Sequence, residues 1–297
     1  MQKFKVTSIG EFLWDIYPDQ KRLGGAPFNF IYHIWKLLGT ANFISSVGND
    51  PLGNEILAYL NKINFPTKNI HVNKKYPTGI VNVSLNENKI PSFKMKSETC
   101  CDYLELDGAD INIIEHETDL LYFGTFSQRN ETTRDTIQSL FKYNIKYFCD
   151  LNLRHSFFTK EMIEKSLSVS NVLKMNEEEF DQLCNIFSLN KNLEDAVYTL
   201  MKRFKIELLC ITRGENGSTM YDLNSTHEYL APKAEVIDTL GAGDAFSAVM
   251  CIGYLDNWNI EKINKLSNEF AGEICKIKGA VPYDDSLYFS ILSKFKN

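Results

Sequence analysis

The sequence has no apolar run of membrane-spanning length and no block of basic residues, and its first residues do not show the pattern of a signal peptide. Without a run of about 20 apolar residues it offers no transmembrane helix. Its net charge of −6, with no basic cluster, argues against nucleic acid or an anionic membrane as a partner. Residues 1–6 lack the apolar stretch and cleavage site of a secretory signal. We therefore expect a cytoplasmic protein that binds neither membranes nor nucleic acids.

Paired cysteine motifs, internal repeats and low-complexity tracts are also missing. The 7 cysteines are odd in number, lie mostly in apolar segments and show no Cys-x-x-Cys spacing, so we expect reduced core residues and no zinc site. The 297 residues are enough for one large α/β domain or two modest ones. Because no long linker interrupts the chain, we expect a single domain over residues 1–297.

Short apolar strands alternate with helical segments through much of the chain. The expected strands are Val6–Ile9, Leu120–Phe123, Lys146–Leu151, Val172–Met175 and Leu208–Thr212. The expected helices are 29–38, 132–143, 159–169, 177–187, 193–204, 242–255 and 260–277. Strict alternation of apolar strands with helices predicts an α/β fold, in which helices cover both faces of a mostly parallel sheet. Ligands of such sheets bind at the carboxyl ends of the strands.

The segment from Asp238 to Phe246 joins a Gly-Ala-Gly turn to an apolar helix. Gly241 and Gly243 allow a tight turn that exposes backbone N–H groups, and the first helical turn adds unpaired donors and a partial positive charge. Such a turn can bind an anion. Asp244 could then take a proton from a hydroxyl that attacks a phosphorus held by the same N–H groups, which predicts phosphoryl transfer. Alternatively, Asp244 only complements the helix dipole and the glycines only turn the chain.

Polar residues and glycines also stand out near the N-terminus. Asp15 lies among bulky apolar residues, so it either accepts hydrogen bonds from ligand hydroxyls or belongs to a turn before Pro18. Gly24 and Gly25 would let a ligand lie against bare backbone, and Asn29 offers both a donor and an acceptor to a hydroxyl. The alternative is an ordinary loop-to-helix junction in which Asn29 is a cap.

Polar residues follow three of the expected strands. Arg154 comes after the strand at 146–151 and could clamp a phosphoryl oxygen. Asn176 follows the strand at 172–175 and could cap the next helix. The acidic residues at 177–179 would then lie at the N-terminus of that helix, where a negative charge is favourable. The turn from Thr212 to Gly217 either lets the backbone approach a ligand or is a plain hairpin turn.

Taken together, these motifs resemble the ribokinase-like (PfkB-type) carbohydrate kinases. The segment 238–246 is similar to their C-terminal signature. Gly24-Gly25-Ala26-Pro27-x-Asn29, followed by Ser46-Val47-Gly48-Asn49-Asp50-x-x-Gly53, is similar to their N-terminal signature in the form of the fructokinase branch. Ile31 departs from the pattern, because the family usually has a small residue there. The resemblance covers nearly the whole chain.

This resemblance implies a ribokinase-like three-layer α/β sandwich with a central, mostly parallel sheet and a small β lid. The lid would be formed mainly by about 13–21 and 78–103, where Gly79–Leu85 and Ser92–Met95 alternate polar and apolar residues around a polar turn at 86–88. Alternatively, these strands are an edge hairpin of the main sheet. A lid that closes would exclude water, which otherwise competes as the phosphoryl acceptor.

The resemblance also implies an ATP-dependent sugar kinase with Mg²⁺ and K⁺ as cofactors. The γ-phosphoryl group of ATP would pass to a primary hydroxyl, with fructose as the expected sugar, while Asp244 takes the hydroxyl proton. The implied site residues are Asp244, the N–H groups of Gly241, Ala242 and Gly243, and Arg154 for catalysis; Asp15, Gly24, Gly25, Asn29 and Asp244 for the sugar; Asn176, Thr212, Gly214, Gly217 and Asn268 for the nucleotide; Glu179 for Mg²⁺ through water; and Asp238 for K⁺.

Several alternatives remain open at the level of the sequence. The substrate could be mannose, ribose, 2-keto-3-deoxygluconate or a sugar phosphate, and a sugar phosphate would need a cationic pocket, to which Lys94, Lys96 and Arg129 could contribute. A non-catalytic sugar or nucleotide sensor on the same fold would be expected to lack the base or an anion-binding glycine. A dinucleotide-dependent dehydrogenase is disfavoured because no Gly-x-Gly-x-x-Gly follows the first strand. An exposed lid strand could pair with a second copy to give a homodimer.

Overall fold

The computed structural model of the protein describes residues 4–85, 91–154, 157–190, 192–232, 235–282 and 284–295, with the backbone alone at 83–85 and 91–94. The polar turn expected at 86–88 lies outside this part of the chain, as does the side chain of Lys94.

A nine-stranded sheet forms the centre of the molecule. Across the sheet the strands are β13 (Thr226–Tyr229), β12 (Ser218–Asp222), β11 (Leu208–Thr212), β10 (Val172–Asn176), β9 (Lys146–Asp150), β8 (Leu120–Gly124), β1 (Val6–Ile9), β4 (Asn42–Gly48) and β5 (Ile70–Asn73). The strands from β11 to β5 run parallel to one another, whereas β12 pairs antiparallel with β11 and β13 pairs antiparallel with β12.

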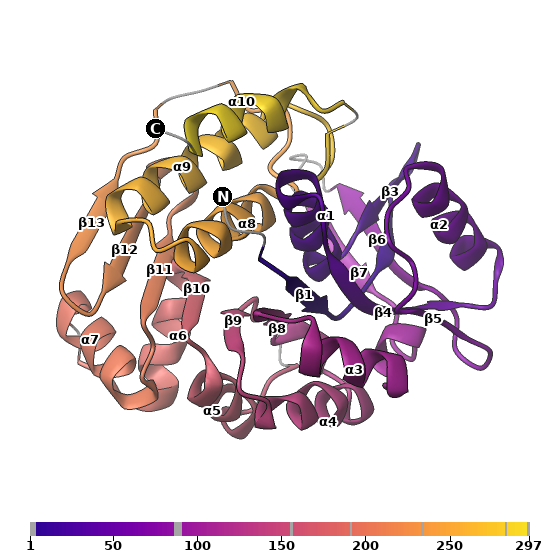
Figure 1. The fold of residues 1–297 in the computed structure, drawn as a ribbon, viewed down its shortest axis with the longest axis horizontal. Coiled ribbons are helices and arrows are strands. Elements are labelled where there is room, and N and C mark those ends of the chain that lie inside the picture. Colours follow the sequence, from indigo (N-terminus) through magenta and orange to yellow (C-terminus); the bar gives the residue numbers. More distant parts are fainter. Residues whose placement is uncertain are drawn as a thin grey trace.

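Helices cover both faces of this sheet (Figure 1). One layer contains α1 (Ala26–Leu38), α2 (Pro51–Lys62), α8 (Ala242–Leu255), α9 (Ile260–Ile274) and α10 (Ser286–Phe295). The other contains α3 (Gly108–His116), α4 (Glu131–Ser139), α5 (Lys160–Val169), α6 (Glu177–Phe187) and α7 (Leu193–Phe204). Single 3₁₀ turns lie at Cys100–Asp102, Phe126–Gln128, Leu140–Lys142 and Gly214–Asn216. The predicted three-layer α/β fold is confirmed.

Two hydrophobic cores lie on opposite faces of the sheet, as the two-residue period of a strand requires. In β8, Leu120 and Tyr122 pack into the core beneath α1, α8 and α9, whereas Leu121 and Phe123 pack into the core above α4, α5 and α7. All four side chains are fully buried. A strand buried on both faces reads as a continuous apolar run, which is why the sequence identified it.

Side chains cap most of the helices, but not the two that meet at the site described below. The capping residues are Asp50 for α2, Asp107 for α3, Asn130 for α4, Thr159 for α5, Asn176 for α6, Asn192 for α7 and Asn259 for α9. By contrast, the N-cap residues of α1 and α8 are Gly25 and Gly241, so neither helix has a side-chain cap. No capping side chain therefore accepts hydrogen bonds from their first-turn N–H groups, which leaves these donors available to other acceptors.

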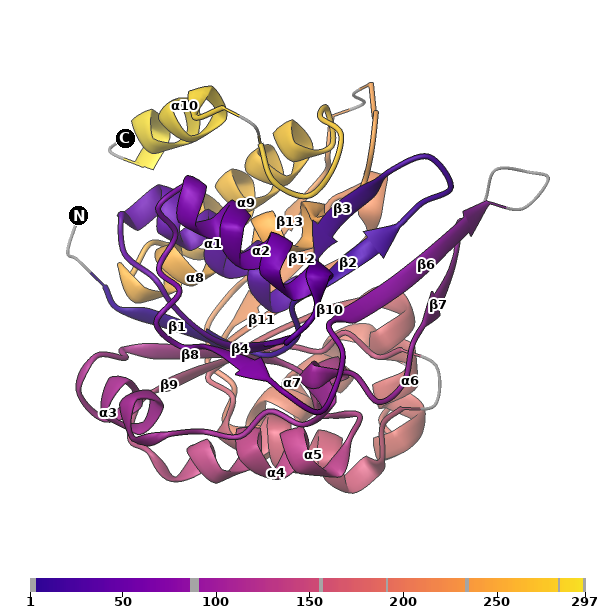
Figure 2. The same ribbon diagram turned by 90° about the vertical axis from the view of Figure 1, so that its right-hand side faces the viewer.

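A second, four-stranded sheet stands out from the body of the molecule (Figure 2). Its strands in order are β3 (Lys21–Gly24), β2 (Leu13–Ile16), β6 (Gly79–Leu85) and β7 (Pro91–Met95). Leu13 and Val81 form its small core, with Tyr17 and Met95 packed against them. The hairpin is therefore part of a separate sheet, as expected for a lid, and not an edge of the main sheet. The chain enters this sheet after β1 and again after β5, on the side where the parallel strands end.

Some element boundaries differ from those expected. The helix expected at 132–143 ends at Ser139 and continues as a 3₁₀ turn. The helix expected at 260–277 ends at Ile274, because the Cys275 carbonyl accepts the N–H groups of Ile237 and Asp238 at 2.9 and 3.2 Å. Sequence analysis did not assign β4, α2, β5 or α3.

All 7 cysteines are free thiols, 5 of them buried, as expected of reduced core residues. Among the described residues, no helix is both long and apolar enough to span a membrane.

Candidate active site

The candidate site lies where α8 begins, at the carboxyl edge of the parallel strands. Gly241 adopts φ 76°, a left-handed conformation that favours glycine, and a Cβ atom there would lie 2.6 Å from Ala280 Cα. The Ala242 N–H donates to Thr239 O at 3.3 Å. The turn thus has no room for a larger residue at Gly241, and it directs the uncapped start of α8 toward the site.

Asp244 lies in the first turn of α8 and is held by α1. The Asn29 amide donates from Nδ2 to Asp244 Oδ2 at 2.8 Å. Burial, together with the nearby Asp150 carboxylate, raises the pKa of Asp244 to about 7, although the Lys174 ammonium and the Asn29 hydrogen bond oppose this rise. A carboxyl with this pKa exchanges its proton near neutral pH, as a general base must.

A buried ion pair supports the start of α8 from below. Lys174 of β10 pairs with Asp150 of β9 at 2.9 Å, and Ser247 Oγ and Tyr122 OH donate to the same carboxylate at 2.9 and 3.0 Å. Burial lowers the pKa of Lys174, but the acids around it outweigh burial and raise it. A Cβ atom on Gly243 would lie 3.2 Å from Lys174 Nζ, so the ammonium lies directly against the turn. This positive charge adds to that of the helix N-terminus.

The residues expected to bind sugar come together between the lid and α1. Asp15 of β2 is buried, and burial raises its pKa to about 6, with the Arg22 guanidinium opposing. A Cβ atom on Gly24 would lie 3.0 Å from Asp15 Cγ, and Gly25 adopts φ 109°, so larger residues would fill this space or strain the backbone. Asn29 Oδ1 is buried and has no hydrogen-bond partner among the described residues.

Glu179 and Asn176 join two strand ends. Asn176 Oδ1 accepts the Glu179 N–H at 2.8 Å, and Glu179 Oε2 accepts the Asn176 N–H at 2.9 Å, which forms the capping box of α6. Glu179 Oε1 accepts the Leu153 N–H at 2.9 Å. The expected capping by Asn176 is therefore present. Each Glu179 oxygen keeps a second lone pair for a water molecule bound to a metal.

Arg154 lies near this edge but is exposed, and its Nε donates to Asn152 Oδ1 at 2.9 Å. Among the described residues, nothing links it to Asp244. Its expected contact with a phosphoryl group stays a prediction. Lys174, which sequence analysis did not select, is the cationic side chain that lies against Gly243.

Four of the five residues expected to bind the nucleotide lie at the junction of β11, β12 and α9, and the fifth, Asn176, ends the neighbouring β10. Thr212 ends β11, and the turn after it contains two glycines. A Cβ atom on Gly214 would have no neighbour within 4 Å, whereas one on Gly217 would lie 2.9 Å from Ala231 N. Asn268 Nδ2 donates to Ser218 Oγ at 2.7 Å. The turn does connect two antiparallel strands, as the plain hairpin interpretation required. Whether it also binds a nucleotide stays a prediction.

Sequence reasoning missed the charged residues beneath α8. Lys174 stands in the otherwise apolar strand Val172–Met175, and a charge in a buried strand needs a partner. That signal was available but did not identify Asp150 as the partner. Glu11, a buried carboxyl that accepts a hydrogen bond from Ser127 Oγ, was also missed; burial raises its pKa.

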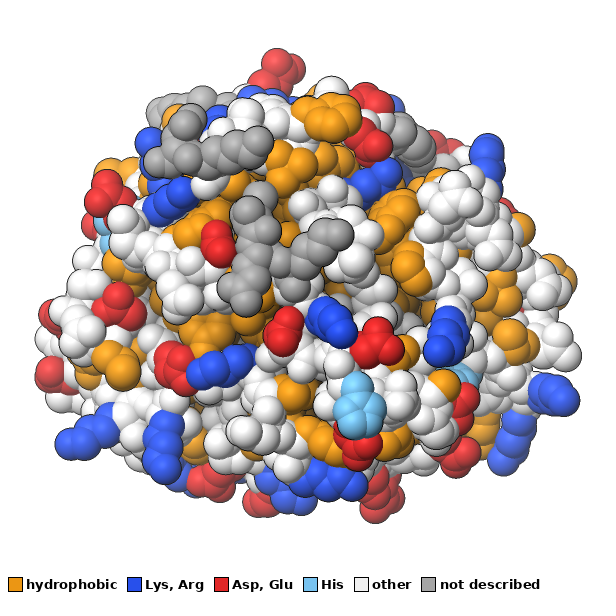
Figure 3. Space-filling model, in the orientation of Figure 1, with side chains coloured by type: hydrophobic (Ala, Val, Ile, Leu, Met, Phe, Trp, Pro, Cys, Tyr) orange, Lys and Arg blue, Asp and Glu red, His pale blue; other side chains and the backbone are white. Residues whose placement is uncertain are grey.

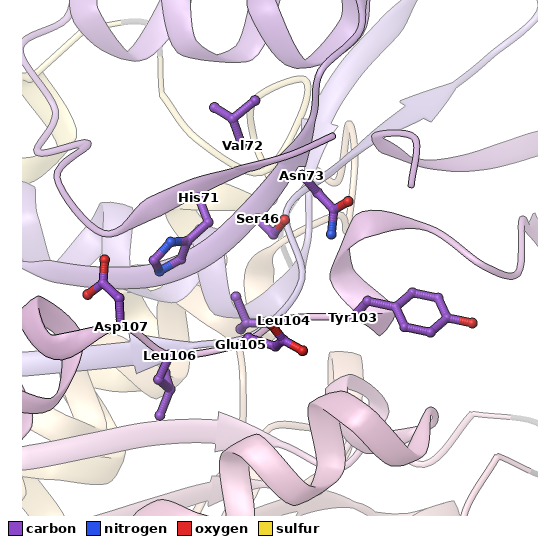
Figure 4. Close-up of a pocket in the computed structure, with 9 residues that line it drawn as sticks. All are labelled: Ser46, His71, Val72, Asn73, Tyr103, Leu104, Glu105, Leu106 and Asp107. Atoms are coloured by element: carbon purple, nitrogen blue, oxygen red, sulfur yellow. The ribbon is translucent and has the colours of Figure 1, made fainter. Parts of the chain in front are cut away.

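A separate pocket of about 280 Å³ lies beside β5 and α3 (Figure 4). Ligand atoms of His71, Asp107 and Asp110 lie within 4.8 Å of one another there. However, Asp110 accepts from His71 and Asn69 at 2.7 and 2.6 Å, and Asp107 caps α3. These groups therefore have structural partners. The residues that line the pocket include Ser46, His71, Asn73, Tyr103, Glu105 and Asp107, and none of the residues expected to be functional is among them.

The molecular face in Figure 3 carries acidic and basic side chains mixed together rather than a block of basic ones. This distribution agrees with the net charge of −6 and offers no extended cationic surface on that face.

Known proteins resemble the chain over most of its length. A family model described as pfkB family carbohydrate kinase matches residues 18–285. An uncharacterized sugar kinase of Pyrococcus horikoshii is 29% identical over an alignment of 307 residues, which covers 95% of this chain and 94% of that protein. A fructokinase of Salmonella typhimurium is 26% identical over 265 residues and 82% of each chain.

Solved structures agree with the fold. The Pyrococcus horikoshii sugar kinase in complex with ATP gives a TM-score of 0.80 at 25% identity, covering 97% of this chain and 99% of that one. A fructokinase of Xylella fastidiosa with bound ATP gives 0.83 at 18% identity and covers 100% of both chains.

Proposed function

Because this chain belongs to the pfkB family of carbohydrate kinases, we propose that it transfers the γ-phosphoryl group of ATP to a primary hydroxyl of a sugar, with fructose as the preferred acceptor. Support for ATP comes from the Pyrococcus horikoshii relative, whose structure contains it. Support for fructose comes from the fructokinase of Salmonella typhimurium. The family membership makes the chain a carbohydrate kinase, and the sugar itself is the part that is proposed.

The observation that carries the mechanism is the placement of Asp244 at the uncapped start of α8. Its carboxylate, with a pKa of about 7, takes the proton of the sugar hydroxyl as the oxygen attacks the γ-phosphorus of ATP, while the bond from that phosphorus to the bridging oxygen breaks and ADP leaves. The N–H groups of Gly241, Ala242 and Gly243 and the helix dipole stabilise the negative charge that develops on the transferring group. Ala242 can contribute after its 3.3 Å bond to Thr239 O opens.

Lys174 adds a fixed positive charge on the other side of the same turn. Because its ammonium lies in a buried region, water screens it little, and its charge acts on the turn together with the opposite charge of the paired Asp150 carboxylate. The Asp150 carboxylate holds it in place. Arg154, on the exposed side, would reach the transferring group only after its side chain leaves Asn152.

The sugar binds between the lid and α1 in this proposal. Asn29 Oδ1 is a buried acceptor that has no partner within the described part of the chain, which is costly unless a ligand donates to it. A sugar hydroxyl supplies that donor next to Asp244. Asp15 accepts from further hydroxyls, and Gly24 and Gly25 leave the space that the ring occupies.

The nucleotide binds on the opposite side, over β11, β12 and α9. Gly214 and Gly217 let the backbone after Thr212 approach it. Asn176 lies opposite Thr212 on the neighbouring strand, and Asn268 Nδ2 donates to Ser218 Oγ. Mg²⁺, when bound, neutralises phosphate charge, and Glu179 would hold it through water.

A phosphorylated sugar is a less suitable acceptor. Arg129, the described arginine that could have bound its phosphate, is 7% exposed and paired with Asp102 at 2.7 Å. To bind Arg129, the phosphate group of a sugar phosphate would have to break this buried ion pair, which costs free energy before any binding is gained. Lys96 is exposed and could reach a ligand only from outside.

The test is a phosphorylation screen with fructose, mannose, ribose, 2-keto-3-deoxygluconate, adenosine and fructose 6-phosphate, with Asp244→Asn as the matched inactive control. We expect the highest kcat/KM with fructose. A higher value with fructose 6-phosphate would overturn the choice of substrate. Sugar binding by calorimetry without turnover of any sugar would instead support a sensor and refute the kinase mechanism.

A further inference from the structure

Arg22 connects the lid to the loop that precedes α8. Its Nη1 donates to the Asp238 carboxylate, and the two side chains are 17% and 21% exposed. Arg22 lies on β3, the edge strand of the lid, whereas Asp238 lies just before the turn at Gly241. The pair therefore spans two parts of the chain that are far apart in sequence and that the proposed reaction needs together.

The Asp238 carboxylate also organises the backbone around that turn. Its Oδ1 accepts the Leu240 N–H at 3.1 Å, and its Oδ2 accepts the Gly279 N–H at 3.0 Å. Gly279 precedes Ala280, the residue against which Gly241 packs. A negative charge at Asp238 thus holds both sides of the anion-binding turn, and it needs a positive charge to balance it near a phosphate.

Asp238 fits a monovalent cation poorly in this arrangement. Both of its oxygens accept hydrogen bonds, and one of the donors is already a cation. A second cation at the same carboxylate would meet repulsion from the guanidinium. The guanidinium is held from other sides as well, because Arg22 Cζ lies 4.8 Å from the centre of the Tyr17 ring and its Cδ lies 3.7 Å from the Cβ position of Gly279.

We infer that Arg22 supplies the positive charge that the family resemblance assigns to K⁺ at Asp238, so that this protein holds its anion-binding turn in shape without a monovalent cation. The inference rests on the proposed kinase function for its meaning in catalysis. Because the charge is carried by the lid strand, the lid and the turn are joined by the same contact.

The experiment compares the unmodified protein with Arg22→Gln, Arg22→Lys and the control Lys21→Gln, in KCl and in tetramethylammonium chloride at equal ionic strength. Lys21 is the neighbour of Arg22 on the same strand, and it pairs with Glu55 instead. Two quantities are measured, namely kcat/KM for the best sugar and the thermal midpoint Tm. The measurement of Tm does not depend on turnover.

We expect the unmodified protein, Arg22→Lys and Lys21→Gln to show the same kcat/KM and Tm in both salts. Arg22→Gln should lose about tenfold or more in kcat/KM in tetramethylammonium, and KCl should restore most of it and raise Tm, since K⁺ can then bind the freed carboxylate. K⁺ activation of the unmodified protein, or no response of Arg22→Gln to K⁺, would overturn the inference. If no sugar is phosphorylated, the proposed function fails, and the Tm comparison still decides the role of Arg22.

Discussion

Replacing Asp244 by Asn is expected to stabilise the folded protein at pH 8 while it removes turnover. The pKa of Asp244 is raised from 3.8 to about 7, mainly by burial. Between these two values the folded protein holds a proton that the unfolded chain has released, so the free energy of unfolding falls as the pH rises through this window. Above pH 7 the full cost of the buried negative charge is present.

The size of the effect follows from the pKa difference. At about 1.4 kcal/mol per pH unit, a difference of about 3 units corresponds to about 4 kcal/mol. Partial contact of Asp244 with solvent reduces this to about 2–3 kcal/mol. Asparagine carries no charge, so Asp244→Asn should gain about 2–3 kcal/mol at pH 8 and almost nothing at pH 4.

Urea unfolding of both proteins at pH 4, 6 and 8 measures this difference, alongside initial rates of sugar phosphorylation. Asp135→Asn is the matched control, because it removes a carboxylate from an exposed position of α4 and should change stability by less than about 0.5 kcal/mol. Turnover of Asp244→Asn should fall by about 10²-fold or more. If the free energy of unfolding of Asp244→Asn at pH 8 is equal to or lower than that of the unmodified protein, the Asp244 carboxylate does not destabilise the fold, and the reasoning is refuted.

Two further predictions concern other positions. Gly241→Ala should cost about 1–3 kcal/mol and most of the turnover, because a side chain there meets Ala280 and φ is 76°. Gly272→Ala in the last turn of α9, with no neighbour within 4 Å of its Cβ position, should instead gain about 0.5–1 kcal/mol. Equal urea midpoints for the two variants would contradict this. His33 is buried against Tyr288, and burial lowers its pKa to about 3, so the unfolded chain takes up a proton below pH 6.5 and stability is lost as the pH falls. The loss in the free energy of unfolding amounts to about 2 kcal/mol at pH 5. His33→Phe should therefore flatten the plot of urea midpoint against pH between 6.5 and 5. An unchanged slope would refute this role of His33.

The strands and helices that sequence analysis recovered are those with a clear period. Val172–Met175 reads as a continuous apolar run because both faces of that strand are buried, and 177–187 repeats apolar residues at helical spacing after a capping Asn176. The helix at 51–62 was missed although Asp50 and Pro51 mark its start, because its residues were read as part of a family motif and not as an element. Helix ends were less certain, since a distant partner such as the Asp238 N–H decides where α9 stops.

The sequence alone determined the local structure at the start of α8 and predicted its chemistry. A Gly-Ala-Gly turn and an acid before an apolar helix predict an anion-binding N-terminus with a carboxylate in it, because these properties depend on residues close in the chain. Only the tertiary structure placed Lys174 under that turn, set the pKa of Asp244 near 7 and joined Arg22 to Asp238. Burial and charge pairing depend on residues brought together from distant segments, and no local pattern of residues records which ones will meet.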